Sequence, residues 1–219
     1  MGVLLVAMTI GGLALAAVLL IAAIAMRKSW LRTFTFGGVA AWFVFYFAML
    51  LAFSLTSKES DLGLNQPKEF CGFYLDCHMH TAVTGVRQTK TIGNKEAKGE
   101  FYIVTVKVFS NAKQATLGLL SVDAHVVDAT GREYSRDSQA ETLLPTQPEF
   151  ERKIAPVENF EKEIVFDLPV DIASPRLDIR EGYGIDHVIE SLLVDDEDSV
   201  LHKRAYFKLE ASAQTAAIK

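Results

Sequence analysis

The stretch Glu-Phe-Tyr-Ile-Val-Thr-Val-Lys-Val-Phe-Ser, residues 100–110, carries the clearest structural pattern in the 219-residue chain. It is rich in β-branched and aromatic residues and contains neither glycine nor proline. Such residues favour a pleated strand, whose side chains alternate between two faces. One face would carry Phe101, Ile103 and Thr105, and the other Tyr102, Val104, Val106 and Val108. The period of two predicts a strand and not a helix.

Similar short runs follow along the chain. Strands are predicted at 119–127, 163–168 and 175–179, and a hairpin is predicted from 191–194 and 205–209 across the acidic turn 195–198. The stretch 141–159 contains three prolines and is predicted to be a long surface loop. Six or seven strands at these spacings indicate an antiparallel β-sandwich of immunoglobulin-like size, so the fold class is mainly β.

Two uncharged apolar stretches precede the strands, Val3 to Met26 and Phe34 to Leu55. A helix needs about 20 apolar residues to cross the hydrocarbon core of a bilayer, so both are predicted to span a membrane. A cleaved signal peptide would begin with basic residues, but none precedes Arg27. The sequence therefore favours an uncleaved two-helix transmembrane hairpin, and the lipid bilayer is its first expected partner.

Charge is divided unevenly along the chain. Residues 1–56 contain Arg27, Lys28 and Arg32 and no acidic residue, a net charge of +3. The whole chain has 22 basic and 27 acidic residues, so 19 and 27 remain in residues 57–219, a net charge of −8. Loops rich in Lys and Arg stay in the cytoplasm. Both termini and the acidic domain are therefore predicted on the periplasmic or extracellular side, and an acidic domain is not expected to bind nucleic acid.

Four segments follow from these patterns: the transmembrane hairpin 1–56, a polar linker 57–69, an extracytoplasmic β-sandwich 70–212 and a flexible tail 213–219. Neither span contains an ionisable residue, so the hairpin is predicted to be an anchor and not an ion pathway. Small residues four apart let helix backbones approach closely. The candidate contacts of this kind are Gly12 with Ala16 and Gly37 with Ala41.

The run Phe-Cys-Gly-Phe-Tyr-Leu-Asp-Cys-His-Met-His, residues 70–80, holds both cysteines of the chain. Three interpretations stay open. In the first, Cys71 and Cys77 form a disulfide, which suits an oxidising compartment. In the second, the segment binds copper or zinc through thiolate, imidazole and thioether ligands. In the third, Cys77 and Met79 fill the core and the two histidines are solvated.

The metal interpretation needs a particular arrangement of side chains. On a strand, Cys77 and Met79 would share one face, while His78 and His80 would share the other. Two imidazoles from one face require a third ligand from elsewhere, and His125 and His202 are the candidates. Outside this segment, the acidic run 195–198 lacks the alternating ligands and the glycine of a calcium-binding loop.

No nucleophile elbow of the Gly-x-Ser-x-Gly type and no His-Glu-x-x-His pair occurs in the sequence. The chain is therefore not expected to be an enzyme. No cofactor is expected either, unless the segment 70–80 holds copper or zinc.

The runs 101–111, 122–134 and 164–169 read as a strand ending in Asn, a strand with an Asp-x-x-Gly-Arg-x-Tyr turn, and a Phe-Asp-Leu-Pro ending. Together they resemble the small immunoglobulin-like accessory domains, of unknown function, in bacterial lipoproteins and membrane-anchored proteins. The resemblance covers residues 80–210 and implies a binding or scaffolding role, with no catalytic residues to transfer. The helical hairpin differs from that family's lipidated cysteine.

In architecture alone the chain is similar to cytochrome oxidase subunit II, although the copper motif of that family is missing. Two functions are expected from these observations. The first is a membrane-anchored, non-catalytic module that binds or stabilises another membrane or envelope protein. The alternative is a copper-binding or redox accessory protein of a respiratory membrane complex that uses the segment Cys71 to His80.

Overall fold

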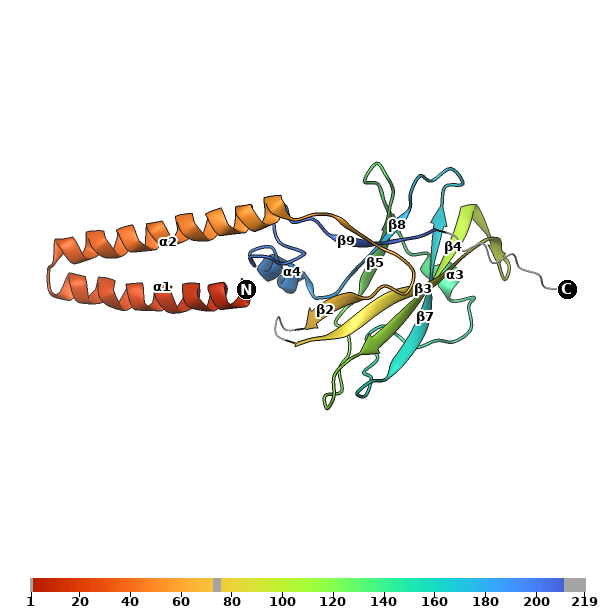
Figure 1. Cartoon of the computed structure of the whole chain (residues 1–219), viewed down its shortest axis with the longest axis horizontal. Coiled ribbons are helices and arrows are strands. Elements are labelled where there is room, and N and C mark those ends of the chain that lie inside the picture. The colour runs from red at the N-terminus through yellow and green to blue at the C-terminus, as the bar shows by residue number, and fades with distance from the viewer. Residues whose placement is uncertain (1, 73–75, 211–219) are drawn as a thin grey trace. The chain divides into compact units, whose positions relative to one another are not determined.

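The computed structural model describes residues 2–72 and 76–210 and contains helices, strands and two β-sheets (Figure 1). The helices are α1 (Gly2–Ala25), α2 (Ser29–Thr56), α3 (Ser138–Glu141) and α4 (Gly184–Glu190). The strands are β1 (Ser60–Leu62), β2 (Lys68–Gly72), β3 (Asp76–Ile92), β4 (Lys95–Ser110), β5 (Asp123–Val127), β6 (Glu133–Ser135), β7 (Asn159–Leu168), β8 (Arg176–Arg180) and β9 (Ala205–Lys208).

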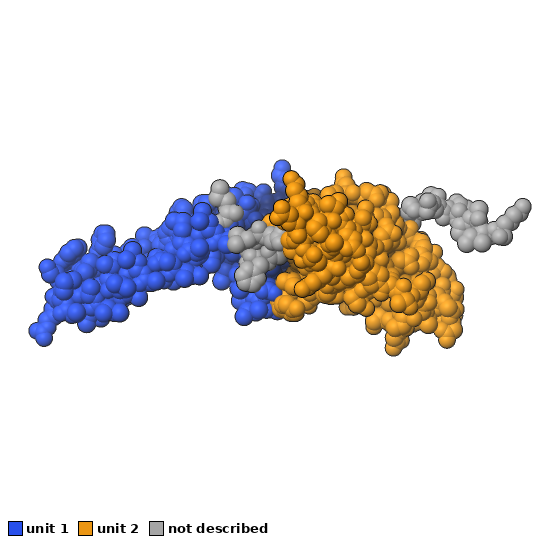
Figure 2. Space-filling model, turned by 90° about the horizontal axis from the view of Figure 1, so that it is seen from below, with its two compact units in different colours: residues 1–59, 184–204 blue, residues 60–183, 205–219 orange. Residues whose placement is uncertain are grey.

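The chain divides into two compact units, each described here by itself (Figure 2). The first, here called the helical unit, comprises residues 1–59 and 184–204. The second, the sandwich unit, comprises residues 60–183 and the chain from Ala205 onward. The boundary after Tyr183 was not predicted, because the sequence pattern placed all of 70–212 in one domain.

The sandwich unit contains a five-stranded sheet of order β1-β9-β8-β5-β6 and a four-stranded sheet of order β2-β3-β4-β7. All neighbouring strands are antiparallel except β1 and β9, which are parallel. The long strands β3 and β4 form a hairpin whose turn begins at Gly93, where φ is +57°, a conformation that glycine adopts at little cost.

Both sheets contribute to one hydrophobic core, which confirms the predicted sandwich. The four-stranded sheet supplies fully buried residues such as Val104 and Phe166, and the five-stranded sheet supplies Leu177 and Phe207.

Several elements of the structure differ from those predicted. The strand expected at 119–127 is confined to Asp123–Val127, and the predicted linker 57–69 already contains β1 and the first residues of β2. The predicted hairpin of 191–194 with 205–209 is wrong, because residues 191–194 form turns after α4 and β9 pairs with β8 and β1. The predicted tail, 213–219, lies outside the described residues.

In the helical unit, α1 and α2 lie side by side as a hairpin (Figure 1). Both are long and apolar enough to cross a membrane, by length and composition. The Trp42 indole Nε1 donates a hydrogen bond of 2.9 Å to the Thr9 hydroxyl between them. Most of their apolar side chains point away from the partner helix, including Ile21, which is 68% exposed, and Phe34, which is 72% exposed.

The rest of the helical unit, residues 184–204, packs against α2. Val194 is buried with Tyr46 and Leu50, and the Tyr46 hydroxyl donates a hydrogen bond of 2.6 Å to the Leu192 carbonyl. Further along, the Lys203 backbone N–H donates to the Ser57 hydroxyl at 2.8 Å. These contacts join the segment to a helix far away in the sequence, and Val194 is the residue that they bury.

A tight turn between β5 and β6 contains a carboxylate with an unusually low pKa. Asp128 Oδ1 accepts hydrogen bonds from the Thr130 hydroxyl at 2.6 Å and from the backbone N–H groups of Thr130 and Arg132, and Oδ2 accepts one from the Tyr134 hydroxyl. These bonds, led by the one from the Thr130 hydroxyl, lower the pKa of Asp128 to about 2.

The lowered pKa of Asp128 makes the free energy of unfolding of the sandwich depend on pH. An unfolded Asp has a pKa of about 3.9, so the stability contributed by ionised Asp128 is present above that pH and is lost as the pH falls toward 2. We expect Asp128→Asn to be less stable than wild type at neutral pH, with the difference shrinking below pH ~4. Urea denaturation at a series of pH values measures it; a difference independent of pH would contradict the assignment.

Candidate functional site

The disulfide interpretation of the segment 70–80 agrees with the structure. Cys71 at the end of β2 and Cys77 at the start of β3 are bonded, with their sulfur atoms 2.04 Å apart. The two strands are antiparallel neighbours, and their register shifts between Phe70 and Gly72, beside this bond. A disulfide sulfur is no thiolate, so neither cysteine serves as a metal ligand in this state. Residues 73–75 lie outside the described residues.

The other candidate ligands of this segment are separated by the pleat of β3. Met79 is buried in the hydrophobic core, which the structural interpretation expected. On the other face, His78 Nδ1 lies 2.6 Å from Asn111 Oδ1, while the ring of His80 stacks on Phe109. Neither suggested third ligand joins them as part of a three-residue metal group among the described residues: His125 lies in the five-stranded sheet and His202 in the helical unit.

The helical hairpin carries the predicted basic residues at one end and the predicted small residues along its two helices. Arg27, Lys28 and Arg32 are all exposed at the closed end of the helical hairpin. Of the small residues, Ala16 is buried, whereas Gly12, Gly37 and Ala41 are exposed. A Cβ atom built on Gly12 or Gly37 would meet nothing within 4 Å, so these glycines do not mediate a close approach of the two backbones.

The sandwich unit has an open groove of about 900 Å³ that sequence reasoning did not find. It is lined by the start of β4, by the chain from Tyr134 to Gln139 and by the turn after β7. The first two meet at an ion pair, in which Lys95 Nζ lies 2.6 Å from Asp137 Oδ1. Such a groove joins segments 40 to 70 residues apart in sequence, so only the folded sheet brings them together.

Charged groups of both signs line the groove. Burial raises the pKa of Asp137, but the hydrogen bond from Lys95, the backbone hydrogen bonds from Ala140 and Gln139 and the charge of Lys95 together outweigh it, so the pKa lies below its ordinary value. Asp137 also caps α3 by accepting a hydrogen bond from the Ala140 N–H. Asp167 accepts two backbone hydrogen bonds, from Lys98 and Gly99, at 2.9 Å each. Asp137 and Asp167 therefore have partners within the chain.

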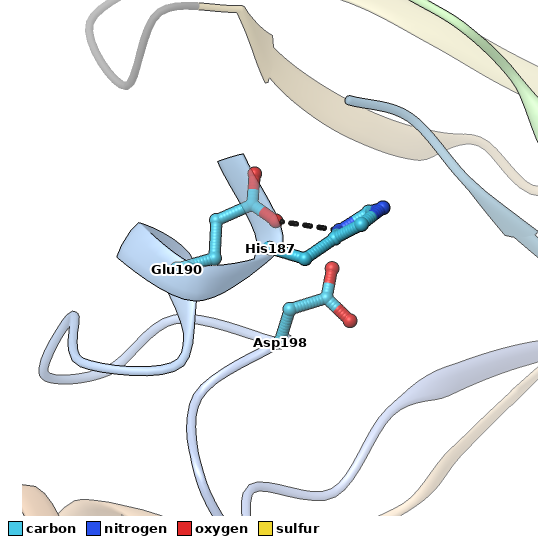
Figure 3. Close-up of side chains that lie close together, drawn as sticks. All are labelled: His187, Glu190 and Asp198. Carbon is cyan, nitrogen blue, oxygen red and sulfur yellow. Dashed lines mark hydrogen bonds and ion pairs between the residues drawn. The ribbon is translucent and has the colours of Figure 1, made fainter. Parts of the chain in front are cut away.

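A second feature missed from the sequence lies in the helical unit. His187 and Glu190 of α4 lie close to Asp198 of the following loop, with the Glu190 carboxylate directed toward His187 (Figure 3). Burial raises the pKa of Glu190, and the neighbouring carboxylates of Asp198 and Asp196 raise it further. The His187 and Glu190 spacing is readable once α4 is known to be a helix, but the sequence pattern had predicted strands on either side of this acidic run.

The fold defines the class of protein: it is a two-sheet β-sandwich module that follows two long apolar helices. Residues 76–187 match the family described as "Domain of unknown function (DUF4352)", and the chain belongs to that family. The match runs from the first residue of β3 into α4. No curated protein matches the chain.

Three solved structures are similar to the chain. The secreted protein MPT63 of Mycobacterium tuberculosis is 11% identical, with a TM-score of 0.42, and the match covers 70% of this chain and 99% of that one. A conserved hypothetical protein of Bacillus anthracis is 11% identical, with a TM-score of 0.41, and the match covers 54% of this chain and 92% of that one. An uncharacterized β-sandwich protein of Clostridium difficile is 12% identical, with a TM-score of 0.37, and the match covers 70% of this chain and 96% of that one.

Proposed function

We propose that the protein is a membrane-anchored, non-catalytic module whose extracytoplasmic, immunoglobulin-like sandwich binds or stabilises another membrane or envelope protein. The observation that carries the proposal is the exposed apolar surface of α1 and α2. Ile10, Ile21 and Val44 are each about two-thirds exposed or more, and the core helices of a soluble protein would bury such residues. An apolar surface of this length is stable in a bilayer and not in water.

Two observations support the orientation. The basic residues Arg27, Lys28 and Arg32 lie together at the closed end of the hairpin, which favours a cytoplasmic position for that end. The disulfide between Cys71 and Cys77 belongs to the sandwich unit, and disulfides persist in oxidising compartments. Both favour an extracytoplasmic sandwich.

The groove beside Asp137 is the surface that we assign to the partner protein. It combines an ion pair, backbone groups and apolar side chains, as protein interfaces do. The copper-binding alternative draws no support from the structure, because the disulfide removes both thiolates and Met79 lies in the core.

Cysteine labelling of intact cells tests the orientation. Ser29→Cys places a thiol at the closed end of the hairpin and Gln114→Cys places one on the sandwich; both positions are exposed, and the native disulfide stays in place. A membrane-impermeant maleimide, applied after permeabilisation of any outer membrane, is expected to label Gln114→Cys in intact cells and Ser29→Cys only after lysis. The reverse labelling pattern would overturn the orientation. Release of the protein from membranes by alkaline carbonate would overturn the membrane anchor.

Photo-crosslinking in the native membrane tests the binding role. A photoreactive amino acid at Ser138, which lines the groove, is expected to capture one defined protein in high yield. The same group at Gln114, which does not line the groove, serves as the matched control and is not expected to capture it. Equal capture at both positions, or none, together with recovery of a monomer in mild detergent, would contradict the proposal.

A further inference from the structure

The segment 184–204 is held in one conformation by the hairpin within the helical unit. Besides the contacts of Val194 and Leu192 with Tyr46, the hydroxyl of Ser199 lies 3.5 Å from that of Ser54. A Cβ on Gly2 would come within 2.8 Å of the Val194 carbonyl oxygen, so α1 also touches the segment. The side chains that the segment carries are therefore positioned by packing and not by the short helix α4 alone.

Three metal-ligating side chains converge on this positioned loop. His187 and Glu190 lie three residues apart on α4 and so share one side of the helix. The His187 Nδ1 atom lies 3.1 Å from Glu190 Oε2. Asp198 completes the group, because one ligand atom from each of the three residues lies within 4.8 Å of the others (Figure 3).

These distances suit one small metal ion. Imidazole nitrogen and carboxylate oxygen bind Zn²⁺ at about 2.0–2.2 Å, which places ligand atoms of a tetrahedral ion roughly 3.3 Å apart. The His187 and Glu190 atoms already have about that separation, and the ligand atom of Asp198 lies within 4.8 Å of both. A donor set with an imidazole favours Zn²⁺ over Ca²⁺ and Mg²⁺, which prefer oxygen ligands throughout.

Charge in the segment also favours a cation. It contains six acidic and two basic side chains, a net charge of −4 with histidines neutral. Arg204 pairs with Asp198 Oδ1 at 2.8 Å and compensates one charge of the group. Asp198 is fixed on its backbone side as well, because its N–H donates to Asp196 Oδ1 at 3.0 Å. A bound divalent ion would change the net charge of the segment from −4 to −2.

We propose that His187, Glu190 and Asp198 bind one divalent transition-metal ion, with zinc as the best match to the ligands. The three residues supply one nitrogen and two oxygen ligands and leave a fourth position open. The bound ion would cross-link α4 to the following loop. The proposal does not depend on the membrane orientation or on the partner of the sandwich.

Metal titration of the full-length protein tests the site. The protein in mild detergent is freed of metal with a chelator and titrated with Zn²⁺ in a calorimeter. Wild type is expected to bind one Zn²⁺ per chain. His187→Ala, Glu190→Gln and Asp198→Asn are each expected to weaken binding by roughly 10- to 100-fold, as loss of a ligand or its support does. Absence of saturable Zn²⁺ binding would overturn the proposal.

Matched variants separate a site from general attraction to acidic residues. Glu197→Gln removes one charge from the same loop and replaces none of the three proposed ligands. Its Zn²⁺ affinity is expected to stay close to that of wild type. Glu190→Asp keeps the charge and shortens its reach, so its affinity is expected to fall. An equal loss in Glu197→Gln, an unchanged Glu190→Asp, or Ca²⁺ binding as tightly as Zn²⁺ would each overturn the assignment.

Hydrogen exchange locates the ion independently of affinity. Zn²⁺ is expected to slow amide exchange across residues 184–204 in wild type and in Glu197→Gln, but not in His187→Ala. Metal-free exchange of each variant shows whether its segment is still folded. Zn²⁺ protection confined to another part of the chain would overturn the proposal.

Discussion

Gly99→Ala is expected to destabilise the sandwich by about 3 kcal/mol, the upper end of the usual cost of overpacking. Gly99 lies in β4 where the register with β3 shifts between Thr89 and Thr91. A Cβ at this position would lie 1.9 Å from the Leu168 carbonyl oxygen and 2.7 Å from its carbonyl carbon. Both are backbone atoms at the end of β7, so the clash cannot be relieved by a side-chain rotation.

The backbone of Gly99 also makes hydrogen bonds that would be lost if this part of β4 moved to relieve the clash. Asp167 accepts the Gly99 N–H at 2.9 Å, and Lys90 Nζ donates to the Gly99 carbonyl. The control is Gly85→Ala in β3, where a Cβ would meet Thr105 at an ordinary 3.6 Å. Urea denaturation in mild detergent, followed by circular dichroism, measures both. Equal midpoints for the two variants would contradict the steric argument.

Asp178→Ala is expected to cost about 3–5 kcal/mol, because it leaves the buried Lys68 and the half-buried Arg180 without their counter-charge. Asp178 on β8 is completely buried. Its Oδ2 accepts hydrogen bonds from Arg180 Nη2 at 2.6 Å and Nε at 2.8 Å, and its Oδ1 lies 3.8 Å from Lys68 Nζ. Lys68 is on β2 and is also buried, so this carboxylate links the two sheets.

Two variants show whether burial causes the effect. Asp178→Asn keeps the shape and one acceptor oxygen, so it is expected to be less damaging than Asp178→Ala. Asp61 also has two cationic partners, Arg176 at 3.6 Å and Lys208 at 3.5 Å, but it is 39% exposed. Asp61→Ala is therefore expected to cost about 1 kcal/mol or less. The same denaturation experiment measures all three, and a cost for Asp61→Ala as large as for Asp178→Ala would contradict this explanation.

Strands with a clean local pattern were predicted well from the sequence. Residues 100–110 lie within β4, 163–168 lie within β7, and 175–179 nearly coincide with β8. Most of the buried side chains of β4 and β7 are β-branched or aromatic, so burial and sequence pattern agree. The apolar helices were predicted for the same reason, since their length and lack of charge are local properties.

The segment 184–204 was predicted wrongly because its conformation depends on distant residues. Leu192 and Val194 read as strand residues beside an acidic turn, but Val194 is buried with Tyr46 and Leu50 of α2, and the Leu192 carbonyl accepts a hydrogen bond from Tyr46, almost 150 residues earlier. The group of His187, Glu190 and Asp198 was missed together with α4. The disulfide was within reach of the sequence, because Cys71 and Cys77 are its only cysteines and lie six residues apart.

The parallel pair of β1 and β9 has a mechanical consequence. β1 follows α2 directly, and its three residues, Ser60–Leu62, are in register with Ala205, Tyr206 and Phe207. If tension were applied between α2 and the chain after β9, the two parallel strands would slide along each other, and their hydrogen bonds would have to break together. A force between those two points would therefore load this three-residue pair in shear.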